Sequence, residues 1–235
     1  MNLSTLKKFA AFLNQTPYLK LRFIKRIGDN LFKLDIGGEI FYFDLSRGRS
    51  MIFMAEDSLV GHKIYNAPFD KSLQKFCWNS WIKQAKTDGN NRILQLFLEL
   101  QSSYKTSEVI LNVEFTGRNT NLILLDTRQI VLDALRHITS KQSFREVHLN
   151  KKLLALPQPK EVVLRDEGDL FLALKNNFSL KIRETLSQKI MRARLHIEQK
   201  IAQLQRMLQS LEKSEVLERE AEEKHRLGQK IINNL

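Results

Sequence analysis

The sequence predicts an α+β domain followed by a long coiled-coil helix, on the basis of three observations. Short runs of β-type apolar residues, bounded by glycine and asparagine, are typical of strands joined in hairpins. Two other segments carry apolar residues every three or four positions, as amphipathic helices do. From about Leu180 onward the chain has no proline and one glycine, Gly228, which favours a continuous helix.

The elements are expected in the following order. A first helix, which Ser4 or Thr5 can cap, places on one face Leu3, Leu6, Phe9, Ala10 and Leu13. Strands follow at 19–28, 30–38, 39–45 and 50–54, with Gly37-Gly38 as a hairpin turn. A second helix over 70–84 is predicted by the spacing of Leu73, Phe76, Cys77 and Trp81. A second sheet region spans 91–100, 107–115, 120–126 and 129–135. We therefore expect an α+β domain over 1–165, a linker over 166–179 and the first arm of a coiled coil over 180–235.

The predicted coil carries an apolar seam and an uneven charge. The seam has heptad spacing with one stutter and consists of Leu186, Ile190, Ala193, Ile197, Ile201, Leu204, Leu208 and Leu211. Such a seam requires a partner helix, which a second copy of this chain can supply. Between Lys181 and Arg206, seven basic residues stand against two acidic ones. This base is either an ordinary solvated face or a surface that contacts rRNA phosphates, through Lys189, Arg192 and Arg194.

The charge of the chain favours a polyanionic partner. Lys and Arg number 38 against 26 Asp and Glu, for a net charge of +12 and a pI near 9.8. The hydrophobic fraction of 43% is enough for a folded core. The one cysteine, Cys77, excludes an internal disulfide and is typical of a reducing compartment. No apolar run is long enough for an export signal or a membrane span, so we expect no membrane partner and a cytoplasmic location.

The sequence contains no motif for catalysis or for a cofactor. The histidines never occur at two-ligand metal spacing, and Cys77 has no neighbouring cysteine, so no zinc site is expected. Glycine-rich phosphate loops and the hydrolase nucleophile elbow are absent from the sequence. Cys77 is interpreted as a buried packing residue, and Asp126 and Asp133 as turn acids. We therefore expect a binding protein that is not an enzyme and has no cofactor.

The segment EFTGRNTNLILLD, residues 114–126, interrupts two strand-like runs with an unusual turn. Gly117 permits a positive φ, so that Arg118 and Asn119 can project from a rigid hairpin. An arginine there can contact phosphate in a bidentate manner or stack on an unpaired base. The alternative is that Arg118 pairs with a local acid such as Glu114, and that Asn119 is only a favourable turn residue.

This segment and the following QIVLDALRHI, SFREV and LALPQP resemble the N-terminal signature of the NFACT family. These are the RqcH-type proteins of ribosome-associated quality control, also known in bacteria as fibronectin/fibrinogen-binding proteins. Two weaker similarities support it, at residues 75–93 and 212–235. The resemblance implies an N-terminal domain similar to that of the formamidopyrimidine-DNA glycosylases, followed by a coiled-coil arm.

The resemblance also implies a function. Such proteins bind a large ribosomal subunit obstructed by peptidyl-tRNA and recruit tRNA, alanyl-tRNA in bacteria. A C-terminal tail is then added without mRNA, and the ribosome performs the chemistry. The family's tRNA-contacting Asp-Arg pair corresponds here to Asn91-Arg92. The implied tRNA-binding residues are Asn91, Arg92, Arg118, Asn119, Arg136 and Arg145, of which Arg136 and Arg145 can instead serve structural ion pairs.

The chain departs from the family pattern in four places. Asn91 replaces an acid, and an amide cannot form the same charge-assisted hydrogen bond. The acid usual in the first helix is absent, with Ser4 or Thr5 near its place. The stretch between Pro159 and the coil is too short for the family's helix-hairpin-helix module. The returning coil arm and the C-terminal NFACT-R domain are missing, so we expect a fragment of a longer protein.

The resemblance also suggests two other functions. A fibronectin-binding surface adhesin is suggested by the family's older name, and the lack of an export signal argues against it. DNA repair is suggested by the glycosylase-like fold. Those enzymes use an N-terminal proline amine and a neighbouring glutamate, whereas this chain begins Met1-Asn2-Leu3 and has no zinc-finger cysteines.

Overall fold

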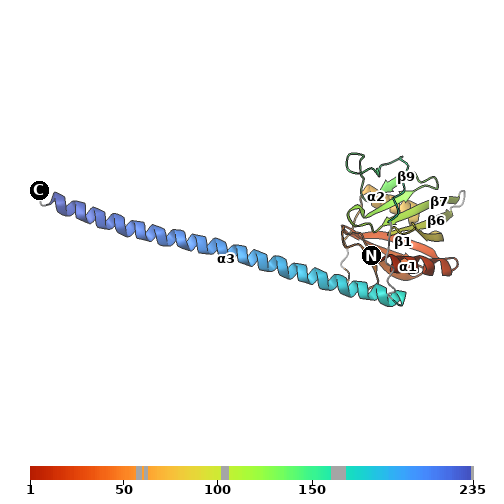
Figure 1. Cartoon of the computed structure of the whole chain (residues 1–235), viewed down its shortest axis with the longest axis horizontal. Helices are drawn as coiled ribbons and strands as arrows, with labels where there is room; N and C mark the ends of the chain where they lie inside the picture. Colours follow the sequence, from red (N-terminus) through yellow and green to blue (C-terminus); the bar gives the residue numbers. More distant parts are fainter. Residues whose placement is uncertain (57–59, 61–62, 102–105, 160–167, 234–235) are drawn as a thin grey trace. The chain divides into compact units, whose positions relative to one another are not determined.

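The computed structural model describes residues 1–56, 60, 63–101, 106–159 and 168–233, with the backbone alone for Arg118 and Glu212. The chain divides into two compact units, Met1–Leu180 and Lys181–Leu235. The elements (Figure 1) are α1 (Leu3–Gln15), β1 (Lys20–Gly28), β2 (Leu31–Ile36), β3 (Glu39–Asp44), β4 (Met51–Phe53), α2 (Pro68–Cys77), β5 (Ser80–Thr87), β6 (Ile93–Gln101), β7 (Thr106–Glu114), the 3-10 turn η2 (Gly117–Asn119), β8 (Asn121–Leu125), β9 (Val131–Ala134) and α3 (Leu170–Ile232). The predicted α+β fold with a long C-terminal helix is confirmed.

The described strands of the first unit form one antiparallel sheet in the order β4-β3-β2-β1-β5-β6-β7-β8-β9. The two sheet regions expected from the sequence are therefore two parts of a single sheet. The two halves join where β1 pairs with β5, at Lys20↔Trp81 and Leu21↔Ser80. The hairpin at Gly37-Gly38 is confirmed, with φ of +64° and +100° and with Ile36 paired to Glu39.

The second helix is shorter than predicted. α2 ends at Cys77, because Trp78 is extended and Asn79 has a φ of +57°. Asparagine tolerates this left-handed conformation better than most residues. Ser80 then begins β5, so Trp81 lies on a strand and not on the helix. The spacing of Leu73 and Cys77 reflects real burial on α2, and its extension to Trp81 was coincidental.

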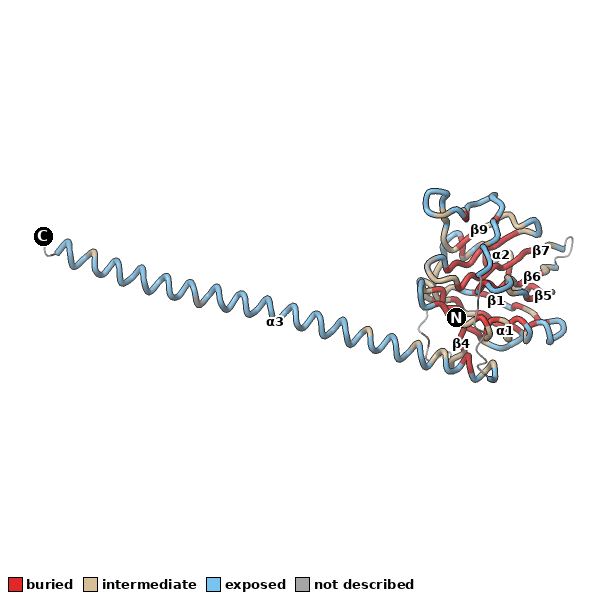
Figure 2. Tube along the Cα trace, viewed as in Figure 1, coloured by how far each residue is buried: buried red, intermediate tan, exposed pale blue. Residues whose placement is uncertain are grey.

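One large core joins α1 and α2 to the sheet. On α1 the predicted face is buried, and Phe9 packs edge-on against Phe41 and Phe43 of β3. On α2, Phe69 packs against Phe32, which pairs with Phe43 across the strands. Both helices therefore contribute to the same face of the sheet. Figure 2 shows the burial concentrated in the strands of this unit.

The first helix is capped by Asn2 and not by Ser4 or Thr5. Asn2 Oδ1 accepts a hydrogen bond from the backbone N–H of Ser4 at 3.0 Å, as an N-cap side chain does. The helix begins at Leu3, one residue before the predicted caps, so Ser4 and Thr5 already belong to it.

The last helix begins earlier than predicted. Residues 166–179 were expected to be a linker, but α3 starts at Leu170. Leu174 is fully buried in the main core, and Phe178 stacks on Phe53 of β4. Asn177 Nδ2 donates to Ile52 O at 2.9 Å, so this part of α3 covers the edge strand β4. The first turns of α3 thus belong to the first unit.

Candidate nucleic-acid interface

The turn η2 connects β7 to β8 and has the geometry predicted for it. Gly117 has a φ of +68°, and an added Cβ atom would meet no heavy atom within 4 Å there, so the backbone conformation is what requires glycine. Thr120 Oγ1 donates to Gly117 O at 2.6 Å and closes the turn. Asn119 is exposed. Arg118 stands at the centre of the turn, and its side chain lies outside the described part of the chain.

A second turn lies against η2. The loop between β3 and β4 reads Ser46-Arg47-Gly48-Arg49, and Gly48 N donates to Gly117 O at 3.2 Å. Gly48 has a φ of +77°, and the bond from Arg49 N to Ser46 O at 3.1 Å tightens the loop. Arg47 and Arg49 are both exposed. Sequence reasoning missed these two arginines, although an Arg-Gly-Arg triplet between strands is a usable signal.

Arg92 joins the same region from the start of β6. Its side chain is exposed, and Nη1 donates to Met1 O at 3.2 Å. The amino group of Met1 in turn donates to Ser50 O at 2.5 Å, next to Arg49. The carbonyl of Arg92 accepts from Phe115 N at 2.8 Å, two residues before η2. Hydrogen bonds therefore connect three segments that are far apart in the sequence. We call Arg47, Arg49, Arg92 and the turn Gly117–Asn119 the arginine surface.

Asn91 is placed differently from Arg92. It is buried, and its Nδ2 donates to Asp88 Oδ2 at 3.1 Å and to Leu156 O at 3.4 Å. Gln158 Oε1 accepts from Asn90 N at 2.7 Å and holds the same turn. An aspartate at 91 would face the Asp88 carboxylate without a donor between them. Asn91 thus secures the turn that presents Arg92.

Arg136 braces the arginine surface from inside. Its Nη1 donates to Thr120 O at 2.5 Å, and its Nη2 donates to Leu45 O at 3.0 Å and to Asn30 Oδ1. It thereby links the end of η2 to the end of β3, from which the Arg47 loop departs. Burial, and then the charges of Arg47 and Arg26, lower the pKa of the Arg136 guanidinium. These contacts give Arg136 a positioning role.

Arg145 forms an internal ion pair. Its Nη1 lies 2.6 Å from Glu114 Oε1, and both side chains are buried. Asn112 Nδ2 donates to the same oxygen at 2.8 Å, and Arg145 Nε donates to Leu154 O. Burial raises the pKa of Glu114 more than Arg145 and Asn112 lower it. Among the alternatives left open by the sequence, Glu114 therefore pairs with Arg145, and we leave Arg145 out of the proposed RNA contacts.

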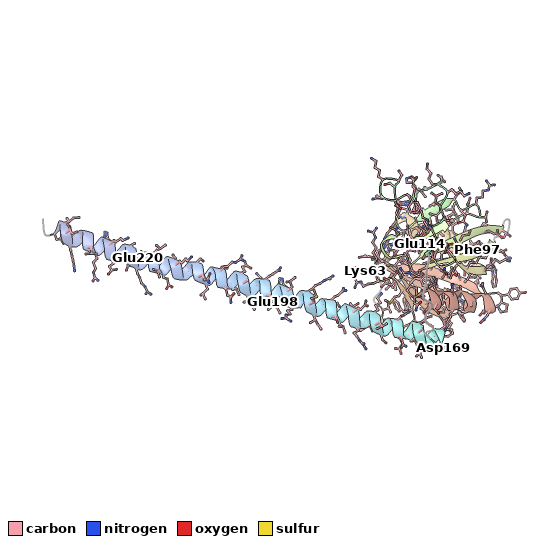
Figure 3. The ribbon with its side chains drawn as sticks, viewed as in Figure 1. Lys63, Phe97, Glu114, Asp169, Glu198 and Glu220 are labelled. Atoms are coloured by element: carbon pink, nitrogen blue, oxygen red, sulfur yellow. The ribbon has the colours of Figure 1, made fainter. Side chains whose placement is uncertain are left out.

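The candidate residues of the coil base lie in the second unit. Lys189, Arg192 and Arg194 are exposed on α3. Arg194 Nε lies 2.9 Å from Glu198 Oε1, one helical turn later, in an exposed pair of the kind that contributes little to stability. Figure 3 shows the place of Glu198 on α3. The seam residues of this unit are exposed as well, and its leucines and isoleucines from Leu186 to Leu211 have exposed fractions between 50% and 68%.

Cys77 and Asp126 both have structural surroundings. Cys77 is fully buried, and burial raises the pKa of its thiol, as expected for a packing residue. Asp126 Oδ1 accepts from the backbone N–H groups of Arg128 and Ile130 at 2.8 Å and is a turn acid. Across the described ranges, His, Cys, Asp and Glu side chains nowhere gather in threes that could hold a metal ion. None of the helices in those ranges has the length and apolarity that a membrane crossing needs.

The comparison with family models decides the family. The model described as "NFACT N-terminal and middle domains" matches residues 63–234, most of the chain. The chain is a member of the NFACT family. The signature in residues 114–159 had predicted this membership.

Solved structures share the fold of this NFACT chain at low sequence identity. The N-terminal part of the fibronectin/fibrinogen-binding protein from Streptococcus suis matches with a TM-score of 0.57 and 18% identity, over 66% of this chain and 61% of that one. The fibrinogen binding protein from Staphylococcus aureus matches with a TM-score of 0.55 and 17% identity, over 68% of this chain and 58% of that one. The N-terminal domain of the fibronectin-binding protein PavA from Streptococcus pneumoniae matches with a TM-score of 0.56 and 16% identity, over 80% of this chain and 85% of that one.

This NFACT chain matches only about 60% of the length of the first two solved relatives. No curated protein matches it significantly in sequence.

Proposed function

We propose that this NFACT chain is an RNA-binding factor of ribosome-associated quality control. In this proposal it binds tRNA and the large ribosomal subunit obstructed by peptidyl-tRNA. It thereby promotes mRNA-independent C-terminal tailing of the stalled chain, with alanine as the expected residue. The ribosome performs the bond-making, and the chain acts as a cytoplasmic scaffold without a cofactor.

The arginine surface is the observation that carries the proposal. Three exposed arginines come from two segments that hydrogen bonds tie to η2, in a chain with a net charge of +12. Guanidinium groups bind phosphate in a bidentate manner and stack on unpaired bases. Their turns are held by Gly48, Gly117 and Asn91, and Arg136 braces two of them from inside. These contacts fix the backbone from which the side chains project, which reduces the conformational freedom lost when RNA binds.

The test compares two arginines of the surface with one outside it. Arg92→Ala and Arg118→Ala should each weaken tRNA binding and reduce the slope of log affinity against log salt by about one unit. Arg128→Ala is the matched control, because Arg128 is exposed in the turn at the opposite end of β8 from η2. Filter binding over a salt series measures the slopes, and circular dichroism checks that each variant folds.

Each outcome of these measurements supports or removes one part of the proposal. Unchanged tRNA affinity in both Arg92→Ala and Arg118→Ala would remove the arginine surface as the site. An equal loss in Arg128→Ala would indicate nonspecific attraction by net charge. Co-sedimentation of the protein with large subunits that carry peptidyl-tRNA, and its absence with empty subunits, tests the ribosomal part of the proposal.

Fibronectin binding is the second candidate, since the names of the three solved relatives mention fibronectin or fibrinogen. At 16–18% identity these likenesses show the fold alone. Binding of the purified chain to immobilised fibronectin, unaffected by competing tRNA, would favour this candidate. Loss of that binding in the presence of tRNA would indicate that fibronectin occupies the same cationic surface.

A further inference from the structure

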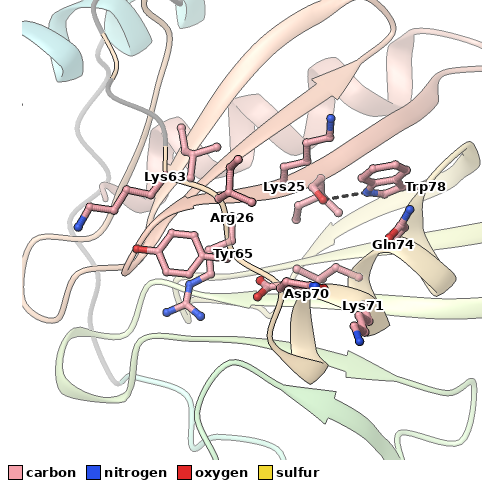
Figure 4. A pocket seen from close by; sticks show the side chains of 13 residues that line it. Lys25, Arg26, Lys63, Tyr65, Asp70, Lys71, Gln74 and Trp78 are labelled. Atoms are coloured by element: carbon pink, nitrogen blue, oxygen red, sulfur yellow. Dashed lines mark hydrogen bonds between the residues drawn. The ribbon is translucent and has the colours of Figure 1, made fainter.

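A cavity of about 380 Å³ lies between β1, α2 and the segment that precedes α2 (Figure 4). None of its lining residues belongs to the arginine surface, so it is a separate feature of the first unit. Its volume falls in the range of small-molecule sites, about 300–1,000 Å³. Its floor is apolar, with the buried Ile24 and Leu73.

Two half-buried aromatic side chains line the cavity, and each is fixed by a hydrogen bond. Trp78 Nε1 donates to Ile24 O at 2.9 Å. Tyr65 Oη donates to Asp29 Oδ1 at 2.6 Å, which lowers the pKa of Asp29 and raises that of Tyr65. Each ring also has a cation beside it: Lys25 Nζ is 5.1 Å from the Trp78 ring, and the Arg26 guanidinium is 4.5 Å from the Tyr65 ring. The rings are therefore held in place before any ligand arrives.

The charge around the cavity is strongly positive. Its lining includes four cations, Lys25, Arg26, Lys63 and Lys71, against one carboxylate, Asp70. Three of these cations, all except Arg26, are exposed at its rim. A ring-lined cavity with this excess of positive charge fits a ligand that has both an anionic group and a flat ring.

Two residues that line the cavity each have a buried side-chain atom without a hydrogen-bond partner. In the part of the chain that the structure describes, three buried side-chain atoms have no hydrogen-bond partner, and two of them are Arg26 Nε and Asp70 Oδ1. Unpaired buried groups are rare and require an explanation. Both atoms are covered by neighbours, so a ligand reaches them only after the side chains turn. The edge of a nucleobase carries both hydrogen-bond acceptors and hydrogen-bond donors. An acceptor of the base can pair with Arg26 Nε, and a donor of the base can pair with Asp70 Oδ1.

We propose that this cavity binds one nucleotide, with its base beside Trp78 and Tyr65 and its phosphate at the lysines of the rim. The nucleotide is either free or an unpaired residue of an RNA chain. The inference does not rest on the proposed function, because it concerns other residues and holds for either source. Stacking on aromatic rings together with a cationic rim is the usual way in which proteins hold unpaired nucleotides.

The test uses tryptophan fluorescence, since the chain has only Trp78 and Trp81. Trp81 lies on β5 and does not line the cavity. In the full chain carrying Trp81→Phe, the remaining signal comes from Trp78, and base stacking should quench it. The titrants are the four 5′-mononucleotides, inorganic phosphate, and an unstructured single-stranded oligoribonucleotide, all at low ionic strength. The reverse variant, Trp78→Phe, reports from outside the cavity and should not respond.

We expect saturable quenching by at least one mononucleotide or by the oligoribonucleotide. Tighter binding of the oligoribonucleotide than of any mononucleotide identifies an RNA residue as the ligand, and equal or weaker binding identifies a free nucleotide. Lys71→Glu should weaken binding by about fivefold to tenfold. Lys75→Glu is the matched control, because Lys75 is exposed one turn later on α2 and does not line the cavity.

Three results would overturn the proposal. One is the absence of Trp78 quenching by every nucleotide and by the oligoribonucleotide. Another is the same response to inorganic phosphate alone, which would indicate a simple anion site. The third is an equal loss in Lys71→Glu and Lys75→Glu. Loss of tRNA binding at the arginine surface would leave this test unaffected, so the two proposals can fail separately.

Discussion

Arg145 and Glu114 show how a residue that sequence patterns select for function can serve the fold. Their charged groups lie 2.6 Å apart, with side-chain exposures of 8% and 2%. They connect β7 to the loop beyond β9, over 31 residues of sequence. Removal of one partner leaves the other charge buried and unpaired, which is costly in a medium of low polarity. The pair therefore matters more to stability than to ligand contact.

Arg145→Ala should lower the free energy of unfolding by about 3–5 kcal/mol, the usual cost of breaking a buried ion pair from one side. Urea unfolding followed by circular dichroism measures the change. Arg92→Ala is the comparison, because Arg92 is exposed, and its effect should stay within about 0.5 kcal/mol. A small effect of Arg145→Ala would show that Glu114 finds another partner or takes up a proton at little cost.

Glu114 also predicts a pH dependence. Burial raises its pKa in the folded state, so the folded protein holds this proton more tightly than the unfolded chain does. Its contribution to stability is present below its ordinary pKa and is lost as the pH rises through the raised value. The stability of the native protein minus that of Glu114→Gln should therefore decrease as the pH rises above the ordinary pKa of a glutamate, about 4. The opposite slope would mean that attraction by Arg145 outweighs burial.

At the scale of elements, α2 and β5 show how a local pattern can mislead. Apolar spacing of three and four continues from Leu73 to Trp81 in the sequence, but the chain changes direction at Asn79. The backbone of Ser80 and Trp81 then pairs with β1, about sixty residues earlier, and this pairing completes the sheet. A single window of sequence contains no information about such a distant hydrogen-bonding partner.

The start of α3 gives a test at the same scale. Leu174 is fully buried and Phe178 stacks on Phe53, so residues 170–180 belong to the core of the first unit. A fragment of residues 1–180 should unfold cooperatively, whereas a fragment of residues 1–169 should lose about 3–5 kcal/mol because it exposes this core. Thermal unfolding of the two fragments measures the difference. Equal stability would mean that residues 170–180 contribute nothing to the core.

At the scale of the whole molecule, the charge is shared between the two units. Residues 181–235 carry 12 Lys or Arg against 8 Glu, and residues 1–180 carry 26 against 18 Asp or Glu, so the first unit keeps a net charge of +8. The arginine surface lies entirely within the first unit. This division allows the contributions of the two units to the proposed RNA binding to be measured separately.

The fragment of residues 1–180 should still bind tRNA, because it contains the whole arginine surface. On large subunits, the slope of log affinity against log salt should be smaller for the fragment than for the full chain. The difference should be up to about three units, one for each of Lys189, Arg192 and Arg194. Alanine at these three positions in the full chain should reproduce the change. A folded fragment that does not bind tRNA would show that the interface depends on the second unit.

The sequence by itself determined the α+β fold class, the long final helix, the apolar face of α1, the positive φ of Gly117 and the family. Each of these depends on local periodicity, on backbone sterics or on a contiguous signature, all of which can be read within a short window. Only the tertiary structure decided that Arg145 and Arg136 face inward, that Asn91 secures a turn, and that Arg47 and Arg49 lie beside η2. Those outcomes depend on hydrogen bonds and burial between segments up to about a hundred residues apart, where chain topology selects the partners.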